Sequence, residues 1–198
     1  MGAIQREFEV LLPIGFTDET GKLHQRAVLR KMRGHEEELL YDPSLTAGRL
    51  VTELIRSCLV RLGDMEPVDS SVVSQLFTAD RNFLLLELRR ITLGNQIHEV
   101  YRCPRCGGDL SLVEDLSEVE VRRLEEGQAL ADVTLTLEDG YVDRRGQSHT
   151  DITLALPRGV DEEFVSPIVD KDPMKAHDAL LLRCIKRFGT LPEAELEA

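Results

Sequence analysis

Hydrophobic and polar positions divide the chain into short segments of two kinds. Segments in which apolar and polar residues alternate predict β-strands; they cover 6–12, 23–31, 97–101, 110–113, 132–137 and 150–156. Segments with apolar residues three and four positions apart predict helices. The first has about 16 residues, is capped by Ser44 or Thr46 and ends before Gly63. The others cover 68–77, 79–93 with Thr78 as its cap, a short segment capped by Asp161 that ends before Pro167, and the segment from Pro173 to Gly189. The pattern indicates an α+β protein.

The chain also contains an internal repeat. A set of residues near the N-terminus recurs near the C-terminus at a constant spacing. The first copy reads Gly15, Phe16, Asp18, Gly21, His24, Leu29, Arg33, Gly34, Glu37 and Glu38, and the second reads Gly140, Tyr141, Asp143, Gly146, His149, Leu154, Arg158, Gly159, Glu162 and Glu163. After one inserted residue, Cys58–Gly63 aligns with Cys184–Gly189. Most matched positions are glycine or charged, so shared hydrophobicity does not explain them. We interpret the copies as an internal duplication of a β-hairpin plus helix unit.

This interpretation gives a domain organisation. Residues 1–66 form the first hairpin-helix repeat, 67–128 hold the central helices and a Cys-x-x-Cys hairpin, and 129–198 form the second repeat. The leucine-rich segment 83–88 is apolar nearly all round, which predicts a helix buried at the centre of the core. We expect the three parts to make one compact body.

Composition narrows the function. The formal charge of −12 disfavours nucleic acid, since affinity for phosphate backbones comes from lysine and arginine. The absence of tryptophan and an aromatic content of 5% disfavour a stacking surface for bases or sugars. No apolar stretch approaches the length of a membrane span, so no membrane partner is expected. Four cysteines, two of them in Cys-x-x-Cys, are typical of a reducing compartment, which predicts a cytoplasmic protein.

The strongest chemical motif is Cys103-Pro104-Arg105-Cys106-Gly107-Gly108, which joins two predicted strands. Two cysteines at this spacing, followed by glycine, form a knuckle that can hold zinc. We therefore predict Cys103 and Cys106 as ligands of a structural zinc. Zinc takes four ligands, and His98, or Cys58 and Cys184, are the candidates for the others. A tight hairpin turn without metal remains the alternative.

The remaining candidate residues indicate structure rather than catalysis. His24 and His149 match, each three residues after a turn glycine, and we expect each to bond within its own hairpin. The acidic clusters 36–38 and 161–163 stand at predicted helix starts, where carboxylates suit the helix dipole and solvent. No phosphate loop, nucleophile elbow or paired-histidine metal helix is present in the sequence. We therefore predict no catalytic residues, no cofactor-binding residues and no enzyme activity.

Three stretches carry a resemblance to a known family: 78–94, which contains an aspartate followed by a leucine-rich helix; the lone Cys-Pro-x-Cys-Gly at 103–107 with Asp115-Leu116; and the late segment 179–184. They resemble the baseplate hub assembly chaperones of contractile phage tails. The stretch 8–42 is also similar to tail assembly proteins of phages and related contractile injection systems. Residues 31–34 depart from that pattern, because a small-residue and threonine-rich segment is expected there.

The resemblance implies a non-enzymatic assembly chaperone or adaptor, acting in the host cytoplasm, whose partners are baseplate hub, tube or tape-measure proteins. The alternative is a structural baseplate or tail component with a stabilising zinc knuckle. A zinc-ribbon regulator of transcription or replication ranks third because of the acidic charge, and an enzyme ranks last. The sequence leaves the oligomeric state open.

Overall fold

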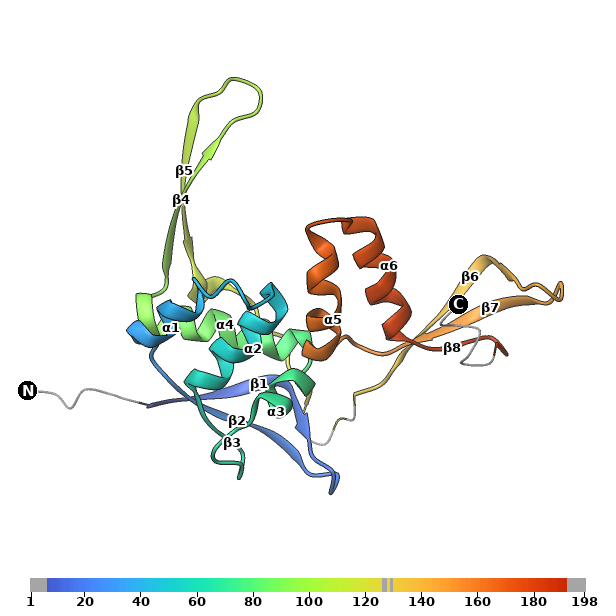
Figure 1. Cartoon of the computed structure of the whole chain (residues 1–198), viewed down its shortest axis with the longest axis horizontal. Coiled ribbons are helices and arrows are strands. Elements are labelled where there is room, and N and C mark those ends of the chain that lie inside the picture. The colour runs from blue at the N-terminus through green and yellow to red at the C-terminus, as the bar shows by residue number, and fades with distance from the viewer. Residues whose placement is uncertain (1–6, 126–127, 129, 192–198) are drawn as a thin grey trace, which may run out of the picture.

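The computed structural model describes residues 7–125, 128 and 130–191, and these fold as an α+β protein with six α-helices and three small antiparallel sheets. Figure 1 shows a body of helices lying on one sheet, a hairpin that projects from it, and a second sheet that extends on the other side of a helix pair. The α+β class is therefore confirmed. None of the described helices combines the length and hydrophobicity that a membrane crossing requires.

The first unit, residues 7–62, begins with a hairpin and continues through two helices to a third strand. Its elements are β1 (Glu7–Thr17), β2 (Leu23–Arg30), α1 (Gly34–Leu39), α2 (Ala47–Cys58) and β3 (Leu59–Leu62). Strand β2 lies in the middle of the sheet and pairs with both β1 and β3. The side chain of Thr46 accepts a hydrogen bond from the amide of Arg49, so Thr46 caps α2 as predicted.

The second unit, residues 133–188, contains the same kinds of element in the same order. They are β6 (Val133–Val142), β7 (Ser148–Leu154), α5 (Gly159–Val169), α6 (Pro173–Cys184) and β8 (Ile185–Phe188). The registers match as well. His24 pairs with Phe16 and His149 with Tyr141, and each hairpin has an irregularity just before that pair. Gly21 and Gly146 have φ of +84° and +79°, which confirms the predicted turn glycines.

Between the two units lie the central elements. These are α3 (Ser70–Gln75), α4 (Thr78–Leu93), β4 (Gln96–Arg102), β5 (Asp109–Asp115) and a short 3-10 helix at Leu116–Glu118. Strands β4 and β5 form a separate two-stranded sheet that carries the Cys-x-x-Cys motif at its tip. Helix α4 packs against β1 and α2. Its residues Phe83, Leu84, Leu88 and Ile91 join the main core, which confirms that the leucine-rich segment is central.

Several predicted boundaries were wrong, and the two units share the main error. Both long helices end at a cysteine, and the next four residues become β3 and β8, which pair with β2 and β7. Leu59 and Leu62 fit either a helical or an extended face, and pairing with the sheet decides between them. Strand β1 also runs beyond Gly15 to Thr17, so the turn is shorter than predicted.

The predicted start of α4 and the predicted end of α5 were also wrong. Phe77, rather than Thr78, is the N-cap of α4, because Phe77 bridges to Arg158 in extended conformation. Helix α5 continues through Pro167 to Val169, although proline cannot donate to the preceding turn. Helix α5 packs along α6 on one side and on α2 on another.

Candidate functional site

Two adjacent charged residues at the start of α4, Asp80 and Arg81, are completely buried. The carboxylate of Asp80 accepts hydrogen bonds from the amides of Ile14 (2.8 Å) and Gly15 (2.9 Å). These amides belong to the first bulge, residues 12–15, where the β1–β2 register shifts. Burial raises the pKa of Asp80, although the two amide bonds act in the opposite direction. Asp80 thus fixes α4 to the sheet of the first unit.

Arg81 turns the other way and joins three further helices. Its Nε donates to Glu162 Oε2 of α5 at 2.8 Å, and its Nη1 donates to Thr52 Oγ1 of α2 at 2.8 Å. Its remaining bonds go to the carbonyl oxygens of Gly48 at 3.2 Å and Val73 at 3.3 Å. A buried charge is costly unless it is paired and hydrogen-bonded. These bonds therefore stabilise the guanidinium of Arg81 in its buried position. This network connects the two units through α4.

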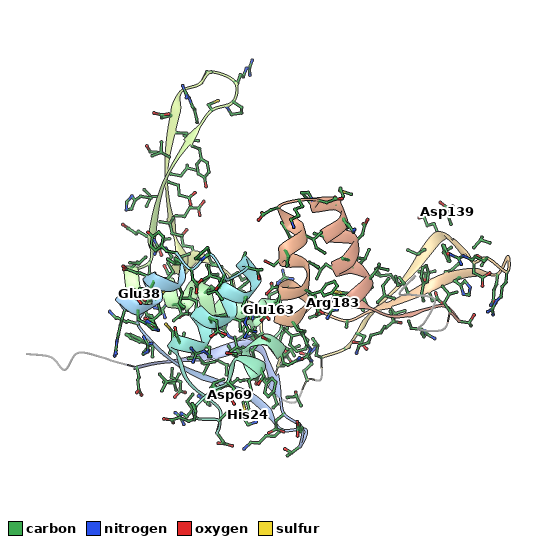
Figure 2. All side chains as sticks on the ribbon, in the orientation of Figure 1. His24, Glu38, Asp69, Asp139, Glu163 and Arg183 are labelled. Atoms are coloured by element: carbon green, nitrogen blue, oxygen red, sulfur yellow. The ribbon has the colours of Figure 1, made fainter. Side chains whose placement is uncertain are left out.

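Glu163 extends the same network on the α5 side. Its Oε1 accepts from Thr52 Oγ1 at 2.5 Å and from Ser74 Oγ at 2.6 Å, and its Oε2 accepts from Arg49 at 3.2 Å. Burial would raise the pKa of Glu163, but these hydrogen bonds lower it overall. Figure 2 labels Glu163 where α5 meets the first unit. The expectation that this acidic cluster is solvated was therefore wrong for Glu163.

The matching cluster in the first unit behaves differently. Glu36 is buried and accepts from Arg30 at 2.6 Å and from the amide of Arg33 at 2.7 Å. Burial alone would raise the pKa of Glu36, but the bonds from Arg30 and Arg33 lower it to about 2. Glu37 and Glu38, which match Glu162 and Glu163, are exposed as expected. Figure 2 shows Glu38 far from Glu163.

The two matched histidines are bound within their own hairpins, as predicted. His24 Nε2 lies 2.8 Å from Asp18 Oδ2, and His149 Nε2 lies 3.2 Å from Asp143 Oδ2. Each imidazole is buried against the glycine that directly follows its unit. A Cβ on Gly63 would come within 2.2 Å of His24 Nδ1, and a Cβ on Gly189 within 2.5 Å of His149 Nδ1. The histidines are thus packed turn supports.

The Cys-x-x-Cys motif forms a tight turn at the tip of the β4–β5 hairpin. The amide of Cys103 donates to the carbonyl oxygen of Gly108, and that of Gly107 donates to Cys103. Amide hydrogen bonds from Cys106 and Arg105 lower the pKa of the Cys103 thiol. Among residues 7–125, 128 and 130–191, no group of three or more histidine, cysteine or acidic side chains is placed to hold a metal.

The suggested additional ligands lie elsewhere. Cys58 is buried at the end of α2, Cys184 ends α6, and His98 is paired with Val113 within the hairpin. Burial raises the pKa of Cys58 and of Cys184, as expected for thiols on apolar helix faces. The structure brings none of these three residues to Cys103 and Cys106 as a ligand set.

A cavity of about 530 Å³ lies between the β1–β2 hairpin and the segments that precede β6 and follow β7. Its walls include Ile14, Leu23, Phe77, Leu156 and Arg158. None of the acidic clusters and neither matched histidine lines it. The carboxylates and histidines that the sequence singled out therefore do not converge on this cavity.

What the surface does show is large apolar side chains on the two projecting sheets. The β4–β5 hairpin exposes Val100 and Val113 on one face and Leu110 on the other, and the second unit exposes Val133 and Leu135. Neighbouring exposed apolar side chains are candidate contacts for another protein. The candidate functional site is accordingly a set of exposed apolar faces on the two projecting sheets.

The buried contacts of Asp80 and Arg81 could not be predicted from the sequence. In the sequence, Asp80 and Arg81 are two adjacent charges in front of a leucine-rich segment, and nothing nearby indicates that they are buried. The signal that was present is Gly159, since a Cβ there would come within 2.3 Å of Arg81 Nη1. A glycine at a helix start indicates that another group packs closely against its Cα, but it does not identify that group.

Comparison with known proteins supports the resemblance. The family described as T4 bacteriophage base plate protein matches residues 20–191, which span both units and the central elements. No curated protein and no solved structure matches the chain. Since the match covers most of the sequence, this chain belongs to the T4 bacteriophage base plate protein family.

Proposed function

We propose that this baseplate-family protein is a non-enzymatic adaptor or assembly chaperone that binds a hub, tube or tape-measure protein in the host cytoplasm. The observation that carries the proposal is the pair of projecting sheets with exposed apolar side chains. Apolar side chains held away from the body cannot add to the core, but they can be buried by a partner.

Co-expression with the hub, tube and tape-measure proteins of the same particle tests the proposal. We expect one of them to co-purify with the chain. Substitution of Val100 and Val113 by aspartate should weaken binding at the hairpin. Failure of all three to co-purify under low and moderate salt would contradict the proposal.

A structural baseplate component is the second candidate, and family membership supports it more directly than it supports a chaperone. The two candidates differ in the fate of the chain after assembly. Immunodetection in purified particles separates them, because a chaperone is lost from the finished particle and a component is retained at a fixed ratio to the other baseplate proteins.

We also propose that the two units arose by duplication of one segment. The matched order of elements, the matched bulges and the matched histidine supports argue for this origin. The units have since diverged in their surroundings, because α4 covers the first sheet while β6 packs extensively only with β7 among the described elements.

For the Cys-x-x-Cys knuckle, we propose zinc binding completed by a partner. Cys103 and Cys106 supply two of the four ligands that zinc takes, and the amides around Cys103 suit a thiolate. The other ligands would then come from the protein bound at the hairpin tip. Metal analysis should find zinc in the complex and little in the free chain, and Cys103→Ser should remove it from the complex. Stoichiometric zinc in the free chain would contradict this proposal.

A further inference from the structure

The sheet of the second unit has an exposed apolar face. The matching face of the sheet in the first unit is covered by helix α4. In the first unit, Leu12 of β1 is completely buried, and Phe8 and Val10 pack against the same core as Phe83 and Leu84 of α4. The matching residues of β6 are Val133, Leu135 and Leu137, whose side chains are 45%, 47% and 37% exposed. We call these three residues the open face.

The open face is continuous with the interior of its own unit. Leu135 pairs with Ile152 and Val133 with Leu154, and residues directly opposite in an antiparallel pair share a face of the sheet. Ile152 is buried, whereas the three β6 side chains beside it are not. Threonines occupy the other face, where Thr134 contacts Thr153 and Thr136 donates to Asp151. The sheet is therefore two-sided, with one face suited to burial.

The bulge beside the open face also matches its counterpart. The second bulge, residues 137–140, interrupts the β6–β7 register as residues 12–15 interrupt β1–β2, and Gly15 and Gly140 both have positive φ. Asp80 accepts from the two amides of the first bulge. Within the described part of the chain, no side chain accepts from the matching amides of Asp139 and Gly140. Figure 2 places Asp139 on the arm formed by β6 and β7.

The charges beside the open face indicate how a helix bound there would be oriented and which residues its first turn would carry. Helix α4 lies on the first unit with its N-terminal turn at the bulge, because Asp80 is in that turn. At the second bulge Glu138 and Asp139 are both exposed, and carboxylates favour the positive N-terminal end of a helix. A basic side chain in that turn would be favoured too. A short neutral acceptor there would bind the two amides without adding negative charge.

Resting on the proposed function, we propose that the open face binds an amphipathic helix of a partner tail protein, its N-terminal turn over the second bulge. The helix carries apolar residues three and four positions apart against Val133, Leu135 and Leu137. Its first turn carries a basic residue and a short polar acceptor such as asparagine. This occupant reproduces on the second unit the packing that α4 provides on the first.

The probe is a capped peptide with the sequence of residues 77–94, in which Asp80 is replaced by asparagine. It keeps the apolar stripe of α4 and the basic Arg81. Fluorescence anisotropy with the full chain should show saturable binding. Leu135→Asp should weaken that binding at least about tenfold, because it places a charge in the apolar contact. Thr134→Asp, on the opposite face of the same strand, should change it by no more than about twofold.

Both substituted side chains are exposed, and circular dichroism would verify that both variants keep the fold. The inference fails if the peptide does not bind, or if Leu135→Asp and Thr134→Asp bind it equally. It also fails if sedimentation shows a dimer of the chain that Leu135→Asp disrupts, because a second copy would then occupy the face.

Co-purification separates this inference from the proposed function. If the wild-type chain and Leu135→Asp capture the same tail protein equally well, the docking site is wrong while the adaptor function stands. If the wild-type chain captures no tail protein, the adaptor function itself is wrong, whatever the peptide does.

Discussion

Removing the guanidinium of Arg81 should destabilise the protein more than any surface change on α4. Arg81→Met keeps most of the side-chain length but leaves Glu162, the hydroxyl of Thr52 and the carbonyl oxygens of Gly48 and Val73 without their donor. Breaking a buried ion pair by removing one partner costs about 3 to 5 kcal/mol. With a urea dependence of about 2 kcal/mol per molar, the midpoint should fall by roughly 1.5 to 2.5 M.

The assay is urea unfolding followed by far-ultraviolet circular dichroism. Arg90→Met is the matched control, since Arg90 lies on the same helix and its side chain, which pairs with Glu87, is 39% exposed and not buried like that of Arg81. An ion pair with an exposed member contributes about 0 to 1 kcal/mol. Because Arg81 connects the two units, its loss should also make the transition broader. Equal midpoints for the two variants would show that the network does not hold the units together.

Three further predictions follow from the same contacts. Asp80→Ala removes the acceptor of two buried amides and should cost about 2 to 6 kcal/mol, measured by chemical unfolding. Gly159→Ala should destabilise by about 1 to 3 kcal/mol because its Cβ meets Arg81, whereas Gly34→Ala at the matched open position should be neutral; equal effects would contradict this explanation. The pKa of Glu36 is about 2 in the fold against an ordinary 4.5, so its contribution of about 3 kcal/mol is present above pH 4.5 and is lost as the pH falls toward 2. Unfolding as a function of pH should show that slope in the wild type and a flatter one in Glu36→Gln.

Much of the fold could be predicted because its signals are local. The hairpin turns depend on Gly21 and Gly146, and the cap of α2 depends on Thr46, so neighbouring residues suffice to find them. The ends of α2 and α6 could not be predicted in this way, because β3 and β8 form by pairing with strands about 30 residues earlier in the chain.

In the candidate site, too, the features that depend on neighbouring residues could be predicted, and most of those that depend on distant residues could not. The histidines and the knuckle are local and were placed correctly in their hairpins. The joint at Arg81 is made of residues from four helices, and no spacing in the sequence links Arg81 to Glu162 or to Thr52. The burial of Glu36 was missed for a different reason. Its partners Arg30 and Arg33 are close in the sequence, but an acidic cluster at a helix start is normally solvated.

The β4–β5 hairpin has a consequence for the dynamics of the free protein. A two-stranded sheet without further strands or a covering helix is at most marginally stable in water. Its amides should therefore exchange with solvent by local opening, many orders of magnitude faster than those of β2, which is paired on both sides. A partner that lies along the hairpin would slow that exchange selectively. The protection pattern before and after mixing thus identifies which tail protein uses the hairpin, without any substitution in the chain.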